Sequence, residues 1–156
     1  QTQFDTIMAY IESGKTSGAQ LHCGGERLRR SDLPEGGYYL PPTLFTDVSD
    51  EAQISCEEIF GPVLPVYPFD SEEELIARAN RTTFGLAAGV WTRDVERAHR
   101  VAARLKAGVV WVNTYNLFDS GVPFGGFKQS GYGRDNGKAA IEAFTETKAV
   151  WVAVKS

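Results

Sequence analysis

The order of apolar and polar residues predicts helices and strands along most of the chain. A first helix is indicated by apolar residues at helical spacing, and Gly14 stands where a left-handed residue would end it. These apolar residues are Phe4, Ile7, Met8 and Ile11. A short extended run at 19–23 and a polar stretch through Pro42, typical of a loop, come next. The pattern then predicts a strand near 43–48.

The middle of the chain predicts a repeated strand and helix order. Residues 63–69 favour a strand, although two prolines interrupt them. Ser71 opens a capping box, in which its hydroxyl and a glutamate three positions later satisfy free backbone donors. A buried strand at 86–92, a helix capped by Asp94 and a strand at 109–113 follow. This order predicts an α/β fold: a parallel sheet with covering helices.

The last part of the chain is less regular. Residues 114–133 are rich in glycine and aromatic side chains and form a connection longer than most, which is typical of functional loops. A helix at 136–145 is predicted, with Ile141 and Phe144 facing inward. The apolar run 149–154 then lies between Lys148 and Lys155. As a free edge strand it would pair with another chain; the alternative is a central strand of its own sheet.

Composition narrows the class of protein. A chain of 156 residues with 42% hydrophobic and 23% charged residues fits one soluble globular domain. A net charge of −4 argues against a nucleic-acid partner, and no apolar run is long enough for a membrane helix. The first residues do not form a signal peptide. Cys23 and Cys56 show neither metal-ligand nor redox spacing, which favours a reducing cytoplasm and no metal site.

No stand-alone active site can be identified from residue types alone. The glycine-rich stretch 126–137 matches neither a phosphate loop nor a dinucleotide fingerprint. His22 and His99 lack a plausible nucleophile partner, so both are interpreted as structural or surface residues. Two glutamates follow Cys56, and their negative charge disfavours a reactive thiolate there, which argues against a catalytic nucleophile.

Four ordered motifs resemble the NAD(P)-dependent aldehyde dehydrogenase superfamily. Residues 57–63 read E-E-I-F-G-P-V, and 80–86 resemble the A-N-x-[ST]-x-[FY]-G-L segment of the family. Residues 111–113 read W-V-N, and 123–134 fit P-[FW]-G-G-x-K-x-S-G-x-G-R. The sequence of the last motif is similar to that of family members that act on aminoaldehydes. Their substrates include γ-glutamyl-γ-aminobutyraldehyde and betaine aldehyde.

The resemblance implies the C-terminal third of such an enzyme. Residues 1–146 would complete the catalytic domain, and 147–156 would form an oligomerisation strand. Family members oxidise an aldehyde to a carboxylic acid with NAD or NADP through a cysteine thiohemiacetal and a thioester. The nucleophilic cysteine and the dinucleotide domain belong to the part that this chain does not match. The resemblance therefore implies no catalytic residue here and no activity of the chain alone.

The resemblance also assigns binding residues. Glu58 would bind the hydroxyls of the nicotinamide ribose and Phe60 would pack beside them, because a carboxylate is an acceptor suited to two neighbouring hydroxyls. Asn116, Phe118 and Phe124 would line the aldehyde tunnel, and an aromatic lining fits an apolar or cationic aldehyde.

The resemblance implies a homo-oligomer as well. Trp151 lies in the strand that extends an intersubunit sheet in the family, and an ion pair between Arg134 and Glu146 would brace that interface. Two alternatives of other classes remain open: a non-enzymatic assembly module of the same fold, and a flavodoxin-like binding domain, disfavoured because a phosphate loop is missing. The choice between NAD and NADP also stays open.

Overall fold

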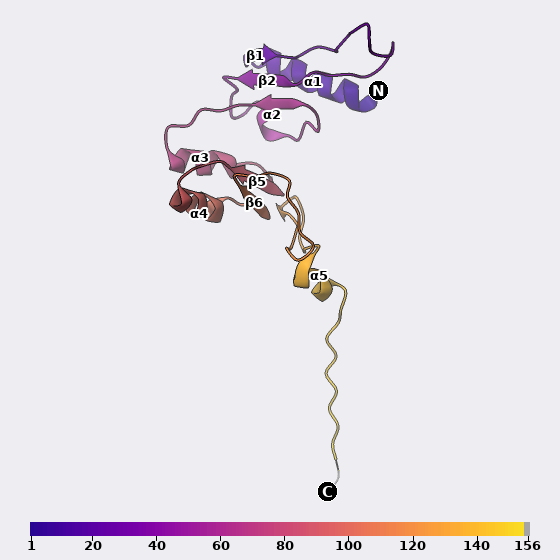
Figure 1. Ribbon diagram of the computed structural model, residues 1–156, viewed down its shortest axis with the longest axis vertical. Coiled ribbons are helices and arrows are strands. Elements are labelled where there is room, and N and C mark those ends of the chain that lie inside the picture. Colours follow the sequence, from indigo (N-terminus) through magenta and orange to yellow (C-terminus); the bar gives the residue numbers. More distant parts are fainter. Residues whose placement is uncertain (155–156) are drawn as a thin grey trace. The chain divides into compact units, whose positions relative to one another are not determined.

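The computed structural model describes residues 1–154 and divides into two compact units (Figure 1). We call Gln1–Asp70 the first unit and Ser71–Ser156 the second unit. Both units combine helices and strands, so the predicted α/β class is confirmed. The prediction of one parallel sheet is wrong, because the strands of residues 1–154 form three separate small sheets.

The first helix, α1, runs over Thr2–Thr16 and is longer than predicted. Gly14 does not end it. A Cβ atom at Gly14 would lie 3.0 Å from both Ile54 Cδ1 and Phe45 Cζ, so the glycine lets the helix approach the core closely. The left-handed residue comes later, at Gly18 with φ of 87°.

The first unit contains a three-stranded sheet. Strand β2 (Thr43–Thr46) lies in its centre, antiparallel to β1 (Gln20–Cys23) and parallel to β3 (Val63–Pro65). The short helix α2 (Gln53–Cys56) lies between β2 and β3 along the chain. As predicted, residues 24–42 contain no helix or strand.

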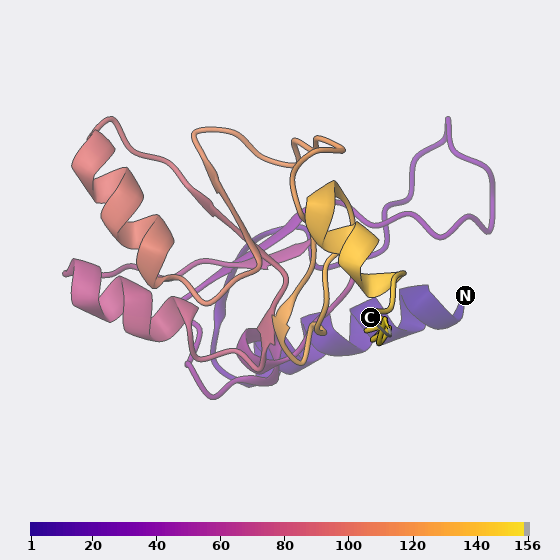
Figure 2. The ribbon, with the colours of Figure 1, turned by 90° about the horizontal axis from the view of Figure 1, so that it is seen from below.

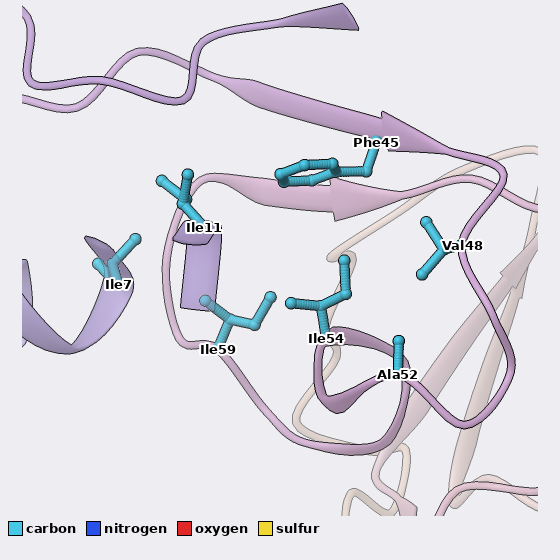
Figure 3. Close-up of a cluster of buried hydrophobic side chains, with 7 residues drawn as sticks. All are labelled: Ile7, Ile11, Phe45, Val48, Ala52, Ile54 and Ile59. Carbon is cyan, nitrogen blue, oxygen red and sulfur yellow. The ribbon is translucent and has the colours of Figure 1, made fainter. Parts of the chain in front are cut away.

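One apolar core holds the first unit together. Figure 3 shows its side chains pointing toward one another from α1, β2, α2 and the adjoining loops. The buried members are Ile7, Ile11, Phe45, Val48, Ala52, Ile54 and Ile59. Ile59 belongs to the predicted cofactor-binding motif, so this core also fixes the motif.

Two capped helices open the second unit, and both caps are those predicted. Ser71 Oγ accepts from the Glu74 backbone N–H at 3.2 Å at the start of α3 (Glu72–Ala79). Asp94 Oδ1 accepts from the Arg97 N–H at 3.0 Å at the start of α4 (Val95–Arg104). The two helices lie side by side in Figures 1 and 2.

Helix α4 connects two parallel strands, β5 (Ala87–Val90) and β6 (Val109–Val112). The predicted crossover is therefore confirmed. The predicted burial of the first of these strands is wrong, since Ala87 and Gly89 are exposed and Leu86 beside them is 45% exposed. In the described chain these two strands pair only with each other.

A second, antiparallel pair joins β4 (Phe84–Gly85) to β7 (Phe127–Lys128). Helix α5 covers Gly137–Ala143, within the predicted range. The inward orientation predicted for Ile141 and Phe144 is wrong, because both side chains are exposed.

The C-terminal segment has no regular secondary structure up to Val154, and Figure 1 draws it as an extended trace after α5. It is exposed throughout, with Trp151 94% accessible. A partner strand within the chain is thus not found in the described part, and the oligomerisation strand stays a prediction. Lys155 lies outside the described residues. Among the helices of residues 1–154, none has the length and apolar character to cross a membrane.

Candidate functional site

The segment 57–63 is fixed by packing and by backbone bonds of the first unit. Ile59 is buried in the core. Gly61 passes so close to α1 that a Cβ atom there would lie 2.6 Å from Ile7 Cδ1. The Thr43 N–H, at the start of β2, donates to Pro62 O at 2.8 Å. These contacts make the segment a well-defined loop rather than a mobile one.

Phe60 adopts a conformation that non-glycine residues rarely take. Its φ is 51°, and its carbonyl oxygen accepts a hydrogen bond of 3.0 Å from Gln3 Nε2. The ring is 77% exposed. A large aromatic side chain is thus held in solvent by a strained but anchored backbone, which is typical of a binding residue.

The two adjacent glutamates have different environments. Glu57 Oε2 accepts from the Tyr10 hydroxyl at 2.8 Å and from Gln53 Nε2 at 3.0 Å. These bonds hold the pKa of Glu57 below its usual range, and the bond from Tyr10 makes the largest contribution. Glu58 is exposed and makes no side-chain hydrogen bond or ion pair with the described residues. Its acceptor oxygens are therefore free to bind a ligand.

Glu58 and Phe60 are not among the residues that line the hollow beside β2 and β3. A shallow hollow of about 440 Å³ lies beside β2 and β3, lined by Cys23, Pro42, Thr43, Leu44, Gly61, Pro62, Val63 and Leu64. The thiols of Cys23 and Cys56 are both free and exposed. Each is directed at a backbone carbonyl, that of Pro42 at 3.7 Å and that of Asp50 at 3.4 Å.

In the second unit, two of the predicted tunnel residues belong to a row of aromatic rings in contact, mostly edge to face. Phe118 lies between Trp111 and Phe124, with ring centroids 5.7 and 5.2 Å away and nearly perpendicular planes. Tyr115 contacts Trp111 at 5.0 Å and Trp91 at 6.5 Å. We call these five side chains the aromatic row. The structure thus brings Phe118 and Phe124 together.

Asn116, the third predicted tunnel residue, lies next to this row without joining it. It is exposed, has a φ of 58°, and no hydrogen bond of its side chain occurs within residues 1–154. Sequence reasoning missed the contributions of Trp91 and Tyr115. Trp111 stood inside the W-V-N motif, and its Nε1 donates to Leu117 O at 2.8 Å, which fixes the loop that carries Phe118.

The motif at 123–134 has a structural role. Lys128 Nζ donates to the carbonyl oxygens of Asn80 and Thr82 at 2.9 and 2.8 Å, so its charge is engaged within the fold. Ser130 Oγ accepts from the Gly85 N–H at 3.0 Å. Together these bonds fasten the motif to the one at 80–86, and they explain why a lysine and a serine stand in it.

The predicted ion pair between Arg134 and Glu146 is not formed in this chain. The Arg134 guanidinium donates instead to the carbonyl oxygens of Gly126 and Gly133 at 3.0 and 2.5 Å, and it lies over the ring of Phe127. Glu146 is exposed. Arg134 Nη1 is engaged by carbonyl oxygens of its own loop, and the segment that carries Glu146 is exposed. The interface role of Arg134, Glu146 and Trp151 stays a prediction.

Comparison with known proteins decides the family. The model of the aldehyde dehydrogenase family matches residues 1–150. The chain belongs to the aldehyde dehydrogenase family. It is 53% identical over 152 residues to a betaine aldehyde dehydrogenase of Cereibacter sphaeroides and 52% identical over 152 residues to one of Brucella anthropi. The family assignment from the four motifs is thereby confirmed.

Solved structures of aldehyde dehydrogenases resemble the chain closely. An NAD⁺ complex of the Bacillus cereus enzyme matches with a TM-score of 0.91 and 52% identity over 99% of this chain. The chain spans only 30% of the length of that enzyme. It spans 30% of the Cereibacter relative and 31% of the Brucella relative.

Proposed function

We propose that this chain is the C-terminal part of an aldehyde dehydrogenase that oxidises an aldehyde to a carboxylic acid with NAD⁺ or NADP⁺. The family membership and the betaine aldehyde dehydrogenase relatives support the reaction. The NAD⁺ complex of the similar Bacillus cereus enzyme supports the cofactor. The observation that carries the role of this chain is the exposed carboxylate of Glu58, unpaired among the described residues, two positions before the exposed ring of Phe60, whose backbone is anchored.

The chemistry of these two residues fits a nicotinamide nucleotide. A carboxylate accepts hydrogen bonds from two neighbouring ribose hydroxyls, and Glu58 has acceptors to spare. The exposed ring of Phe60 offers an apolar face to a flat heterocycle. Because the segment 57–63 is fixed by Ile59 and Gly61, both groups would hold the nucleotide in one orientation.

The proposed reaction leaves clear tasks to residues outside this chain. A cysteine thiolate adds to the aldehyde carbon to form a thiohemiacetal, and a glutamate activates water to hydrolyse the resulting thioester. The bound nucleotide supplies the hydride acceptor between these two steps. Glu58 and Phe60 would orient it, and Asn116 and the aromatic row would enclose the aldehyde. We therefore expect the 156-residue chain alone to be inactive.

The aromatic row favours an apolar or cationic aldehyde. Aromatic faces attract ammonium groups, and the contribution is about 0.5–2 kcal/mol for each ring. This agrees with an aminoaldehyde or betaine aldehyde as substrate, and betaine aldehyde is the compound in the names of two relatives. The test compares kcat/KM for betaine aldehyde with that of 3,3-dimethylbutanal, its uncharged isostere. A preference for the uncharged compound would contradict the cationic substrate class while leaving aldehyde oxidation intact.

Exposed apolar surface supports incorporation into a larger assembly. Leu86, Trp91 and Val95 in the second unit are exposed, as are Trp151 and its neighbours at the C-terminus. Such surface is costly in water, so we infer that the remainder of the enzyme covers part of it and a second subunit pairs with 148–154. An assembly module without catalysis would use the same surface. It would not need the free carboxylate of Glu58, which favours the enzyme.

The decisive experiment is Glu58→Gln in the intact enzyme that carries this sequence. We expect single-turnover reduction of NAD⁺ to slow about 10- to 100-fold, because a misplaced nicotinamide lowers the fraction of reactive geometries. Hydrolysis of the acylated enzyme should be unchanged. Glu35→Gln, an exposed glutamate of the loop before β2, is the matched control. Equal rates of NAD⁺ reduction in Glu58→Gln and wild type would contradict the proposal.

A further inference from the structure

Glu57 is tied to two different helices through one oxygen atom. Its Oε2 accepts from the hydroxyl of Tyr10 in α1 and from the side-chain amide of Gln53 in α2. Glu57 immediately precedes Glu58, the residue that the proposed function assigns to the ribose. The environment of Glu57 therefore bears directly on where the Glu58 carboxylate lies.

The charge states of this contact are well defined. The Tyr10 bond is the main cause that lowers the pKa of Glu57, followed by the Gln53 bond. The hydrogen bond with Glu57 is also the main cause that raises the pKa of Tyr10. At neutral pH Glu57 is thus a carboxylate and Tyr10 a neutral phenol that donates, which is the combination that gives a charge-assisted bond.

The two bonds to Glu57 differ in what they connect. Gln53 stands four residues before Glu57 on the same single turn of helix, so its bond is local and moves with α2. Tyr10 is 47 positions away on α1. Its bond is therefore the side-chain contact that joins Glu57 to the long helix. On the other side of Glu58, Ile59 is fixed by the core, in which α1 also takes part.

We propose that Tyr10 is a positioning residue: through Glu57 it fixes the backbone from which the Glu58 carboxylate projects toward the ribose. The inference rests on the proposed function of Glu58. Tyr10 does not itself reach the nucleotide in this proposal. It holds one neighbour of Glu58 while the core holds the other, so the carboxylate is pre-oriented before the nucleotide binds.

The first test is Tyr10→Phe, which removes the hydroxyl and keeps the ring. In the intact enzyme without nucleotide, hydrogen exchange of the peptide 53–60 should become about two- to tenfold faster, the change expected for one lost hydrogen bond. The Kd for NAD⁺, measured by calorimetry, should rise by a similar factor. The KM for the aldehyde should not change.

Tyr38→Phe is the matched control. It also removes a tyrosine hydroxyl from the first unit, one that donates to Gln1 Oε1 at 3.3 Å. Exchange at 53–60 and the Kd for NAD⁺ should both equal the wild-type values. If Tyr38→Phe weakens NAD⁺ as much as Tyr10→Phe does, the effect reports general stability, and the positioning role is wrong.

A double-mutant cycle tests whether Tyr10 acts through Glu57. In the Glu57→Ala background, Tyr10→Phe should change the Kd for NAD⁺ less than 1.5-fold, since its acceptor is already gone (about 0.2 kcal/mol). Full additivity of the two changes would overturn the inference. If Glu58→Gln itself leaves NAD⁺ binding and reduction unchanged, the proposed function fails. If Glu58→Gln acts and Tyr10→Phe does not, the inference alone fails.

Discussion

Each of the two units is stabilised internally in a different way. All seven buried apolar side chains of the first unit belong to one core cluster. Within residues 71–154 the second unit buries four, Ile76, Ala98, Val101 and Trp111, and leaves most of its large apolar side chains exposed. Its segments are joined instead by side-chain hydrogen bonds to the backbone, by ion pairs between α3 and α4, and by glycines at close contacts.

This difference explains where the family motifs lie. In the first unit a single motif, at 57–63, is mounted on a core and presents two exposed groups. In the second unit the motifs at 80–86 and 123–134 fasten each other through the bonds of Lys128 and Ser130. A family motif can therefore supply a proposed ligand contact, or it can hold two backbone segments together. The residues that contact the motif decide between these two roles.

Removing the largest core side chain should have the largest effect. Phe45 is 0% exposed, so Phe45→Ala leaves a cavity and should lower the free energy of unfolding by about 3–5 kcal/mol. Hydrogen exchange followed by mass spectrometry, read separately for the two units, measures the change. Phe144→Ala, at an exposed site of the second unit, is the control and should stay within about 0.5 kcal/mol.

The outcome would contradict the comparison if both variants were equally mild. It would mean that the first unit does not depend on its core. Loss of protection limited to the first unit would sharpen the comparison, because it would show that the two units unfold as separate cooperative parts.

The sequence predicted the elements whose causes are local. The caps at Ser71 and Asp94 depend on residues three positions away, and both were found. The end of the first helix was wrong because Gly14 serves a contact with Phe45 and Ile54, which lie far along the chain. Burial of 86–92 and of Ile141 was wrong for a related reason: hydrophobicity predicts a tendency to be covered, and the described chain does not provide the cover.

The candidate site was predictable only through the resemblance. Adjacent glutamates look alike in a sequence, and the difference between Glu57 and Glu58 depends on Tyr10, 47 positions earlier. The aromatic row likewise joins rings of three separate segments. The pair of Arg134 and Glu146 was also expected from the resemblance, but within this chain the carbonyl oxygens of Gly126 and Gly133 accept from the guanidinium instead.

Disrupting a close glycine contact in the second unit should cause the second-largest loss of stability, after Phe45→Ala. A Cβ atom at Gly108 would lie 1.6 Å from Gly125 O, so Gly108→Ala forces the two loops apart. We expect a loss of about 1–3 kcal/mol, measured by exchange of β6 and β7. Gly121→Ala is the control, since its Cβ atom would meet only Asp119 Oδ1 at 3.1 Å. Equal stability of both variants would show that the close approach of Gly108 to Gly125 does not stabilise the second unit.

Acidification should produce the smallest effect and should act first on α3 and α4. Glu72 accepts from Arg100 at 2.7 and 3.0 Å, and Glu73 is paired with Arg104, so these bonds hold the pKa of each carboxylate below its usual range. A lowered pKa in the folded state means that the stabilisation is complete above about pH 4.3 and is lost as the pH falls further. The protection factors of the α3 amides, which correct for the pH dependence of intrinsic exchange, should therefore fall below that pH, while the core of the first unit stays protected. Glu72→Gln should flatten this pH dependence. The control Glu142→Gln, on α5, should leave it unchanged. An unchanged pH profile in Glu72→Gln would show that the ion pairs do not link the two helices.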